Sequence, residues 1–329
     1  MLKTAESVSP SHPDKLCDRI SDAILDYCLN NDKDSRVAIE TMGGHGLITI
    51  TGELTTNGQI DLGEIIKIAK RIGGENNEIK INIIAQSPEI SRGVDTGGAG
   101  DQGIMVGYAC NDNDSLIPQE TYLTRSLCNY IYERHPYDGK TQVTLNNGKI
   151  KTIVVSFCKL PKEDILKFTK EWWQKLSNKE IDFEILANPA GDWSQGGFEA
   201  DTGLTGRKLA IDNYGPQIPI GGGAFSGKDS SKVDRSGAYM ARRIAVDLLK
   251  ENDFKEVIVK IAYAIGKKEP VMTSFEATNN KDEKISGEID SQKYDLTPLG
   301  IINFLELKNP QFEKTAEWGS FGHGFTWDK

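Results

Sequence analysis

Helical and strand-like patterns alternate along this chain from its first residues, and that alternation restricts it to a mixed helix and sheet architecture. Residues 14–29 carry apolar side chains at helical spacing, and Pro13 suits the first turn of a helix. The same patterns predict further helices at residues 62–72, 121–133, 162–176, 232–250 and 298–307. They predict strands at residues 36–41, 47–51, 79–85, 183–186, 209–212, 256–265 and 271–277.

A hairpin is predicted at residues 141–157, where Asn147-Gly148 provides a tight turn between strands rich in Val, Thr and Ile. With 329 residues, the chain exceeds the usual size of one hydrophobic core. We therefore expect an α+β fold of three similar α/β-sheet domains, with bounds at residues 1–97, 98–195 and 196–329. No sequence repeat relates the three domains to one another.

Charge and cysteine usage exclude several classes of protein. The net charge is −9 and no basic stripe is present, so neither nucleic acid nor an anionic membrane is an expected partner. No run approaches the ~20 apolar residues of a membrane span, and the first residues lack the apolar region of a signal peptide. The five cysteines form no CxxC pair, which favours reduced thiols and a cytoplasmic location. Cys17 and Cys28 fit the apolar pattern of the first helix as small hydrophobes.

A glycine-rich segment at residues 221–232 is the strongest indication of phosphate binding. Its glycines let backbone N–H groups approach an anion, and Lys228 and Lys232 add positive charge. From Gly222 the spacing imitates a P-loop, but Asp229 stands where a P-loop has Ser or Thr, and no hydrophobic strand precedes it. Polyphosphate binding is favoured over a P-loop, and a flexible surface turn stays the alternative.

The start of the first helix is a second candidate for anion binding. A helix N-terminus attracts anions, and His12 and Lys15 strengthen that field. Asp14 is a candidate Mg²⁺ ligand, because Mg²⁺ combines few carboxylates with substrate phosphates. The alternative is that Ser11 or Asp14 only caps the helix. Aspartates recur every four residues after Asp14, and we expect a solvated acidic face formed by Asp18, Asp22 and Asp26.

Two further segments combine glycine with charge. Residues 87–103 are predicted to form a long loop, either a binding segment or a plain linker, and Asp101 near its end could bind a sugar hydroxyl or an amine. Residues 201–208 place Asp201 shortly before Arg207 and Lys208. This basic pair could neutralise phosphate oxygens, or it could form surface salt bridges.

Taken in order, these motifs closely resemble those of the S-adenosylmethionine synthetase family. The matching runs are His-Pro-Asp-Lys at 12–15, Gly-Ala-Gly-Asp-Gln-Gly at 98–103, Asp-Thr-Gly-Leu-Thr-Gly-Arg-Lys at 201–208 and Gly-Gly-Gly-Ala-Phe-Ser-Gly-Lys-Asp at 221–229. The resemblance covers nearly the whole chain and implies three domains in a pseudo-threefold arrangement. It also implies a tight homodimer with active sites between subunits, a tetramer being left open, and two Mg²⁺ ions per site with a K⁺ activator.

The reaction that the resemblance implies joins ATP to L-methionine. Methionine sulfur displaces triphosphate from the 5′-carbon of ATP, and the triphosphate is hydrolysed to phosphate and pyrophosphate. The implied catalytic residues are His12, Lys140, Arg207, Lys208 and Lys228. ATP binding is implied for His12, Asp101, Lys140, Trp193, Asp201, Arg207, Lys208, Ala224 and Lys228. Methionine binding is implied for Glu53, Gln86, Asp201 and Lys232, Mg²⁺ binding for Asp14 and Asp234, and K⁺ binding for Glu40.

The chain departs from the family pattern at a few positions. Ser11 replaces the usual Gly before His12, and Asp192-Trp193 stands where the family usually has Arg-Phe. The loop at residues 86–98, the central domain and the C-terminal tail are shorter than usual. Two other functions are weighed against this one and disfavoured: a kinase that transfers only the terminal phosphate, and a catalytically silent subunit that keeps the fold.

Overall fold

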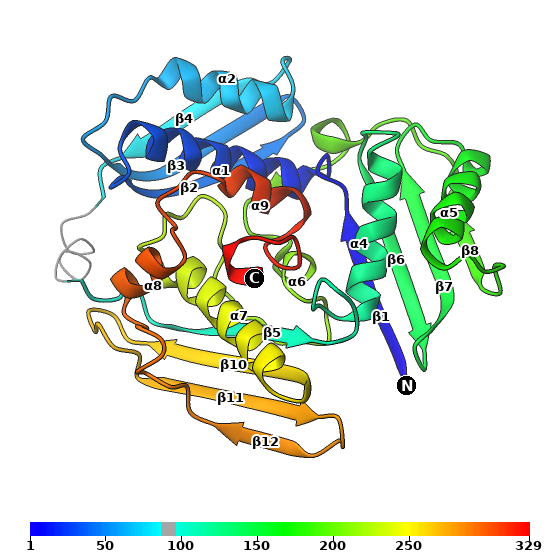
Figure 1. Ribbon diagram of the computed structural model, residues 1–329. Helices are drawn as coiled ribbons and strands as arrows, with labels where there is room; N and C mark the ends of the chain where they lie inside the picture. Colours follow the sequence, from blue (N-terminus) through cyan, green and yellow to red (C-terminus); the bar gives the residue numbers. More distant parts are fainter. Residues whose placement is uncertain (87–96) are drawn as a thin grey trace.

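The computed structural model describes residues 1–86 and 97–329, which form three four-stranded sheets (Figure 1). Their strand orders are β4-β3-β2-β9, β8-β7-β6-β1 and β12-β11-β10-β5. Helices pack against the sheets, so the molecule consists of three α+β units around a common centre. The expected α+β fold of three similar units is confirmed.

The first unit has the element order helix, hairpin, helix, strand. α1 (Pro13–Asn31) precedes the hairpin of β2 (Arg36–Gly44) and β3 (Leu47–Thr55), and α2 (Leu62–Gly73) leads to β4 (Glu78–Ile84). β4 runs parallel to β3, because the chain crosses over through α2. The sheet face beneath the helices is apolar, as Val37, Ile39, Ile48 and Ile50 are buried.

The second and third units repeat the helix and hairpin. The second contains α4 (Gln119–Tyr132), β6 (Gly139–Asn146), β7 (Lys149–Phe157), α5 (Lys162–Ser177) and β8 (Glu184–Ala187). The third contains α7 (Val233–Glu251), β10 (Phe254–Tyr263), β11 (Met272–Asn279), β12 (Lys284–Gly287), α8 (Pro298–Phe304) and α9 (Phe312–Trp318). The predicted hairpin is confirmed, and Asn147 and Gly148 have φ values of 50° and 78°, as a type I′ turn requires.

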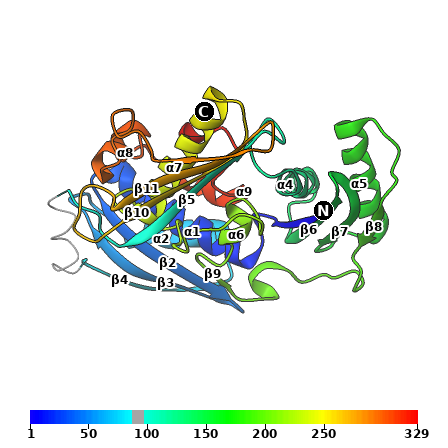
Figure 2. The same ribbon diagram turned by 90° about the horizontal axis from the view of Figure 1, so that it is seen from below.

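Each sheet takes its fourth strand from a distant part of the chain. β1 (Leu2–Val8) pairs with β6, β5 (Gly103–Cys110) with β10, and β9 (Gly203–Leu204) with β2, always antiparallel. Figure 2 shows β1 beside β6, away from β2, β3 and β4. The sheets therefore interlock, and each contains residues from outside the range predicted for its domain. The domain bounds at 97 and 195 stay a prediction, and residues 87–96 of the predicted loop lie outside the described residues.

The strand predicted at residues 209–212 is wrong, because α6 (Leu209–Asp212) is a single helical turn. Within it, the N–H of Asn213 donates to the carbonyl of Leu209 at 3.0 Å. The buried guanidinium of Arg125 donates to the carbonyl of Ile211 at 2.6 Å. A short apolar run does not distinguish strand from helix, and here a side chain from α4 takes a carbonyl that a neighbouring strand would otherwise bind.

The solvated acidic face predicted for α1 is also wrong. Asp18 and Asp22 are 1% and 0% exposed, and Asp26 is half-buried. α1 lies between its own sheet and α9, so it is covered on two sides (Figure 1). Burial raises the pKa of Asp18 to about 7. All three carboxylates accept backbone N–H groups, which offsets part of the loss of hydration.

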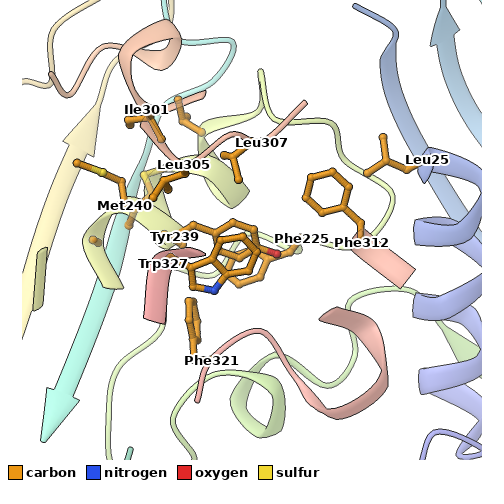
Figure 3. Close-up of a cluster of buried hydrophobic side chains, with 14 of the residues drawn as sticks. Leu25, Phe225, Tyr239, Met240, Ile301, Leu305, Leu307, Phe312, Phe321 and Trp327 are labelled. Atoms are coloured by element: carbon orange, nitrogen blue, oxygen red, sulfur yellow. The ribbon is translucent and has the colours of Figure 1, made fainter. Parts of the chain in front are cut away.

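An aromatic cluster joins the glycine-rich segment to the end of the chain (Figure 3). Tyr239 of α7 stacks on Trp327 with ring centroids 3.8 Å apart. Phe225 and Phe321 pack edge-on against Tyr239, at 5.6 Å and 6.0 Å. This cluster anchors Phe225, and with it the loop that carries Lys228.

The cysteines behave as predicted, since all five are free and buried. Cys17 and Cys28 of α1 pack in the hydrophobic core as small hydrophobes. In the part of the chain that the structure describes, no helix is long and apolar enough to cross a bilayer.

Candidate active site

A first cationic cluster surrounds the start of α1. His12 is the N-cap residue, and its Nδ1 accepts the N–H of Asp14 at 3.2 Å. The alternative that Ser11 or Asp14 caps the helix is therefore wrong: His12 is the cap, and the carboxylate of Asp14 binds other groups. It accepts the N–H of Leu204 at 3.0 Å. It also pairs with the ammonium of Lys208 and, at 3.4 Å, with Nε of Arg207.

Glycines allow the segment that carries Arg207 and Lys208 to lie against α1. A Cβ atom on Gly203 would be 2.1 Å from the carbonyl oxygen of Pro13, so a side chain there would push the segment away. Gly206 has a φ of 80°, in the left-handed region that glycine tolerates. The two basic residues follow this turn directly and face Asp14.

His12 is a neutral hydrogen-bond donor in this cluster. Burial, followed by the positive charges of Lys208 and Lys140, lowers the pKa of His12 to about 3. The exposed Lys140 on β6 therefore belongs to the first cluster, together with Asp201, whose charge acts on the same ring. Because Nδ1 accepts the N–H of Asp14, the single ring proton lies on Nε2. His12 can donate this proton to a substrate oxygen without carrying a charge.

Asp14 stays ionised although it is buried. Burial by itself raises the pKa of a carboxyl, but hydrogen bonds from Lys208 and the Leu204 N–H bring the pKa of Asp14 below its ordinary value. Residues 1–86 and 97–329 contain no group of three or more His, Cys, Asp or Glu side chains placed to hold a metal. The ionised carboxylate of Asp14 is the kind of oxygen ligand that a Mg²⁺ ion shared with substrate phosphates would use.

A second cationic cluster lies at the start of α7. Lys228 pairs with Asp234 of the first helical turn at 2.7 Å, and Lys232 pairs with Asp229. Asp229 also accepts the N–H of Val37 at 2.7 Å, which ties the segment to β2. Like Asp14, Asp234 is a carboxylate beside a lysine, so it offers Mg²⁺ the same kind of single ligand.

Glycines also shape the glycine-rich segment. A Cβ on Gly223 would lie 2.2 Å from Oδ1 of Asp234, and one on Gly227 would lie 1.9 Å from the carbonyl oxygen of Ile39. A side chain at Gly227 would therefore require a shift of the backbone, and one at Gly223 would displace the side chain of Asp234. The segment follows α6 and a turn rather than a buried strand, which agrees with the sequence argument against a P-loop.

The other predicted ATP-binding residues are less closely connected to the two cationic clusters. Ala224 lies against Gly206, since a Cβ on that glycine would be 2.7 Å from the Ala224 Cβ. Trp193 is half-buried, and its carbonyl accepts the N–H of Lys159 at 2.7 Å. The carboxylate of Asp101 is exposed and accepts the N–H of the next residue, so no described contact joins it to either cluster.

The predicted methionine and potassium ligands lie on the first sheet. Glu53 of β3 is paired with Ile84, close to the end of β4, and the N–H of Gln86 donates to Thr55 at 3.3 Å. The side-chain oxygen of Gln86 is buried and has no hydrogen-bond partner among the described residues. Glu40 is exposed on β2, opposite Thr51 in register. Glu53 and Gln86 thus lie near the same end of the first sheet, whereas Lys232 lies in the second cluster.

No hydrogen bond or ion pair of the described residues joins the first cluster directly to the second. The link between them is indirect and runs through α1, by way of residues that sequence reasoning did not select. Asp22 binds the N–H of Gly227 at 2.8 Å and both of its oxygens accept from the guanidinium of Arg235, also at 2.8 Å. The four-residue repeat of aspartates is the signal in the sequence, but by itself it predicts a solvated face.

Comparisons with known proteins match the whole chain. Family models for S-adenosylmethionine synthetase match as its N-terminal domain at residues 1–93, its central domain at 96–193 and its C-terminal domain at 195–329. The S-adenosylmethionine synthase of Treponema denticola is 41% identical to this chain, in an alignment that covers 99% of this chain and 95% of that protein. The S-adenosylmethionine synthases of a Nitratiruptor species and of Mesoplasma florum are 41% and 39% identical, over 100% of this chain and 95% and 97% of theirs.

Proposed function

Because the chain belongs to the S-adenosylmethionine synthetase family, it is a transferase that forms S-adenosylmethionine from ATP and methionine, and we propose that the two cationic clusters perform this reaction. Methionine sulfur attacks the 5′-carbon of ATP, and the released triphosphate is hydrolysed to phosphate and pyrophosphate. A thioether carries no proton, so the attack needs no general base. The demanding part is the leaving group, on which negative charge develops.

The observation that carries the proposal is a neutral His12 inside a cluster of cations. In our assignment, Nε2–H of His12 donates to the bridging oxygen of the triphosphate as the bond to the 5′-carbon breaks. Lys140, Arg207 and Lys208 hold the phosphate oxygens, so positive charge is in place before the transition state forms. Loss of one such donor costs about 10²–10³ in turnover in enzymes that stabilise anions this way.

The remaining roles follow the same logic. Lys228 binds phosphate, with Asp101, Asp201, Trp193 and Ala224 around the adenosine part of ATP. Glu53, Gln86, Asp201 and Lys232 bind methionine. The buried, unpaired oxygen of Gln86 supports its assignment, because the ammonium of an amino acid would supply the missing donor.

Asp14 and Asp234 are the residues that would hold two Mg²⁺ ions, and Glu40 would hold K⁺. Bound Mg²⁺ would neutralise charge on the polyphosphate. The lysines now paired with these carboxylates, Lys208 and Lys228, would then be free to contact phosphate oxygens.

We further propose a homodimer with active sites shared between subunits. Two outer sheet faces expose apolar side chains that a monomer would normally cover: Met42, Ile84 and Leu204 on the first sheet, and Ile104 and Met272 on the third. Glu40 and Glu53 lie on the first of these faces. In our assignment, the second cluster of a partner seated there completes the site at the first cluster of this chain, because no hydrogen bond or ion pair among residues 1–86 and 97–329 joins the two clusters within one chain directly.

Mixing two inactive variants tests the shared site. Lys208→Met disables the first cluster and Lys228→Met the second, so a mixed dimer holds one intact site. Equal amounts of the two, mixed under conditions that exchange subunits, should recover about a quarter of wild-type activity. Recovery of nothing from proven mixed dimers would mean that each site is built from one chain. Light scattering during size-exclusion chromatography separates dimer from tetramer.

Product analysis tests the function itself. The protein is incubated with ATP, methionine, Mg²⁺ and K⁺, and the products are identified by mass spectrometry. Methionine-dependent S-adenosylmethionine with phosphate and pyrophosphate is expected. ADP would indicate a phosphate-transferring kinase, and bound ATP without product would indicate a silent subunit.

Five free, buried thiols support the proposed cytoplasmic location, because such thiols are typical of reducing compartments.

A further inference from the structure

Four aspartates of α1, spaced by one helical turn, each bind backbone N–H groups from another part of the chain. We call Asp14, Asp18, Asp22 and Asp26 the aspartate ladder. Their partners are, in order, the N–H groups of Leu204, Gly206, Gly227, and both Phe312 and Glu313, at distances of 2.8–3.0 Å. One rigid helix thus holds three separate segments.

The two middle aspartates hold the same local structure twice. Asp18 accepts the N–H of Gly206, which has a φ of 80° and directly precedes Arg207. Asp22 accepts the N–H of Gly227, which has a φ of 79° and directly precedes Lys228. In both cases a buried carboxylate fixes a left-handed glycine, and the next residue carries a cation of the proposed site.

Additional bonds support both attachments. Beside Asp18, the buried ammonium of Lys15 donates to Asp212 at 2.6 Å, at the end of the turn that follows Lys208. Beside Asp22, Arg235 donates to the carbonyl of Lys228 at 2.9 Å. Each basic segment is therefore held on both sides of its cation. Glycine-containing segments are flexible by themselves, so these bonds restrict where the cations can lie.

We propose that Asp18 and Asp22 are positioning residues, which set the location of the two phosphate-binding segments without touching substrate. The proposal rests on the proposed function, because it assumes that Arg207, Lys208 and Lys228 bind the polyphosphate. Hydrogen bonds to a carboxylate are stronger than neutral ones, and a buried carboxylate has few other partners. Misplacement of catalytic groups by about 1 Å can lower turnover about 10²-fold.

Asp18→Ala is the first test, measured against inorganic tripolyphosphate with Mg²⁺. Calorimetry should give an affinity about tenfold weaker than wild type, because the segment that carries Arg207 and Lys208 loses a hydrogen bond that holds it in place and must be ordered on binding. Turnover to S-adenosylmethionine should fall, while KM for methionine stays unchanged. Asp18→Asn keeps an oxygen for the Gly206 N–H and should restore most of the affinity. That rescue separates positioning by the hydrogen bond from an effect of charge.

Asp26→Ala is the matched control, because Asp26 belongs to the same ladder but holds α9 rather than a basic segment. It should lower the unfolding temperature and leave tripolyphosphate affinity unchanged. Equal affinities for Asp18→Ala, Asp26→Ala and wild type, in a wild-type enzyme that makes S-adenosylmethionine, would overturn the proposal. A wild-type protein that makes none would instead contradict the proposed function. If Asp18→Ala does not fold, Asp18→Ser, which is too short to reach the Gly206 N–H, carries the same expectation.

Discussion

Arg235 should be among the most costly side chains of this protein to remove. It is fully buried on α7, where one guanidinium nitrogen donates to both oxygens of Asp22 at 2.8 Å and another to the carbonyl of Lys228 at 2.9 Å. Arg235→Met keeps much of the volume but removes every one of these bonds. The Asp22 carboxylate would then stay buried without a counter-charge, with hydrogen bonds from the N–H of Gly227 and the side chain of Ser226.

The expected loss follows from this burial. Removing one partner of a buried ion pair costs about 3–5 kcal/mol, because the other charge is left without compensation. A second change, Asp22→Asn, removes that charge while an amide oxygen still accepts the Gly227 N–H. The double variant should therefore be more stable than the two single losses predict, with an interaction energy of up to about 3 kcal/mol.

Urea denaturation, followed by circular dichroism and tryptophan fluorescence, measures these free energies of unfolding. Arg243→Met is the control: Arg243 lies on the same helix and pairs with Asp247 at 3.0 Å, but it is partly exposed, so about 0–1 kcal/mol is expected. Strict additivity of Asp22→Asn and Arg235→Met, or a loss for Arg235→Met no larger than that of the control, would refute the reasoning.

Three further outcomes are expected. Burial and neighbouring cations lower the pKa of His12 to about 3, so its ring should stay neutral at pH 7. In the unfolded chain the same ring binds a proton below about pH 6.5. The contribution of His12 should therefore lower the free energy of unfolding as the pH falls from about 6.5 towards 3. Nitrogen NMR shifts of the ring check this, and Lys140→Met should raise that pKa. Gly227→Ala would place a Cβ 1.9 Å from the carbonyl oxygen of Ile39 at a φ of 79°, so it should lower both the urea midpoint and turnover. Trp193→Ala should raise KM for ATP and leave KM for methionine unchanged if the ring stacks on adenine; equal effects on both would exclude that role.

Local patterns were sufficient for many of the elements. The helical spacing of residues 14–29 predicted α1, and Asn147-Gly148 predicted the hairpin of β6 and β7, because neighbours in sequence determine both. Motif order and charge also selected His12, Asp14, Arg207 and Lys208, which the structure brings together. Residue type and short spacing carry this information, so no long-range contact was needed to obtain it.

Pairing between distant strands was not accessible in the same way. Nothing within residues 2–8, 103–110 or 203–204 states that each completes a sheet formed mainly by another unit. The single turn of α6 depends likewise on Arg125, whose partners are 86 and 88 residues away in sequence. Such contacts are decided by which surfaces meet in the folded chain.

The aspartate ladder shows the division most clearly. The sequence alone determined that α1 is a helix and that its aspartates share one face, because a repeat of four nearly matches the helical period. Whether that face meets water or protein was decided only by the tertiary structure, in which α9 and the two glycine-containing segments cover it. Water molecules and fixed backbone N–H groups can both donate the hydrogen bonds that a carboxylate needs. An aspartate in the sequence therefore does not reveal whether water or protein surrounds it.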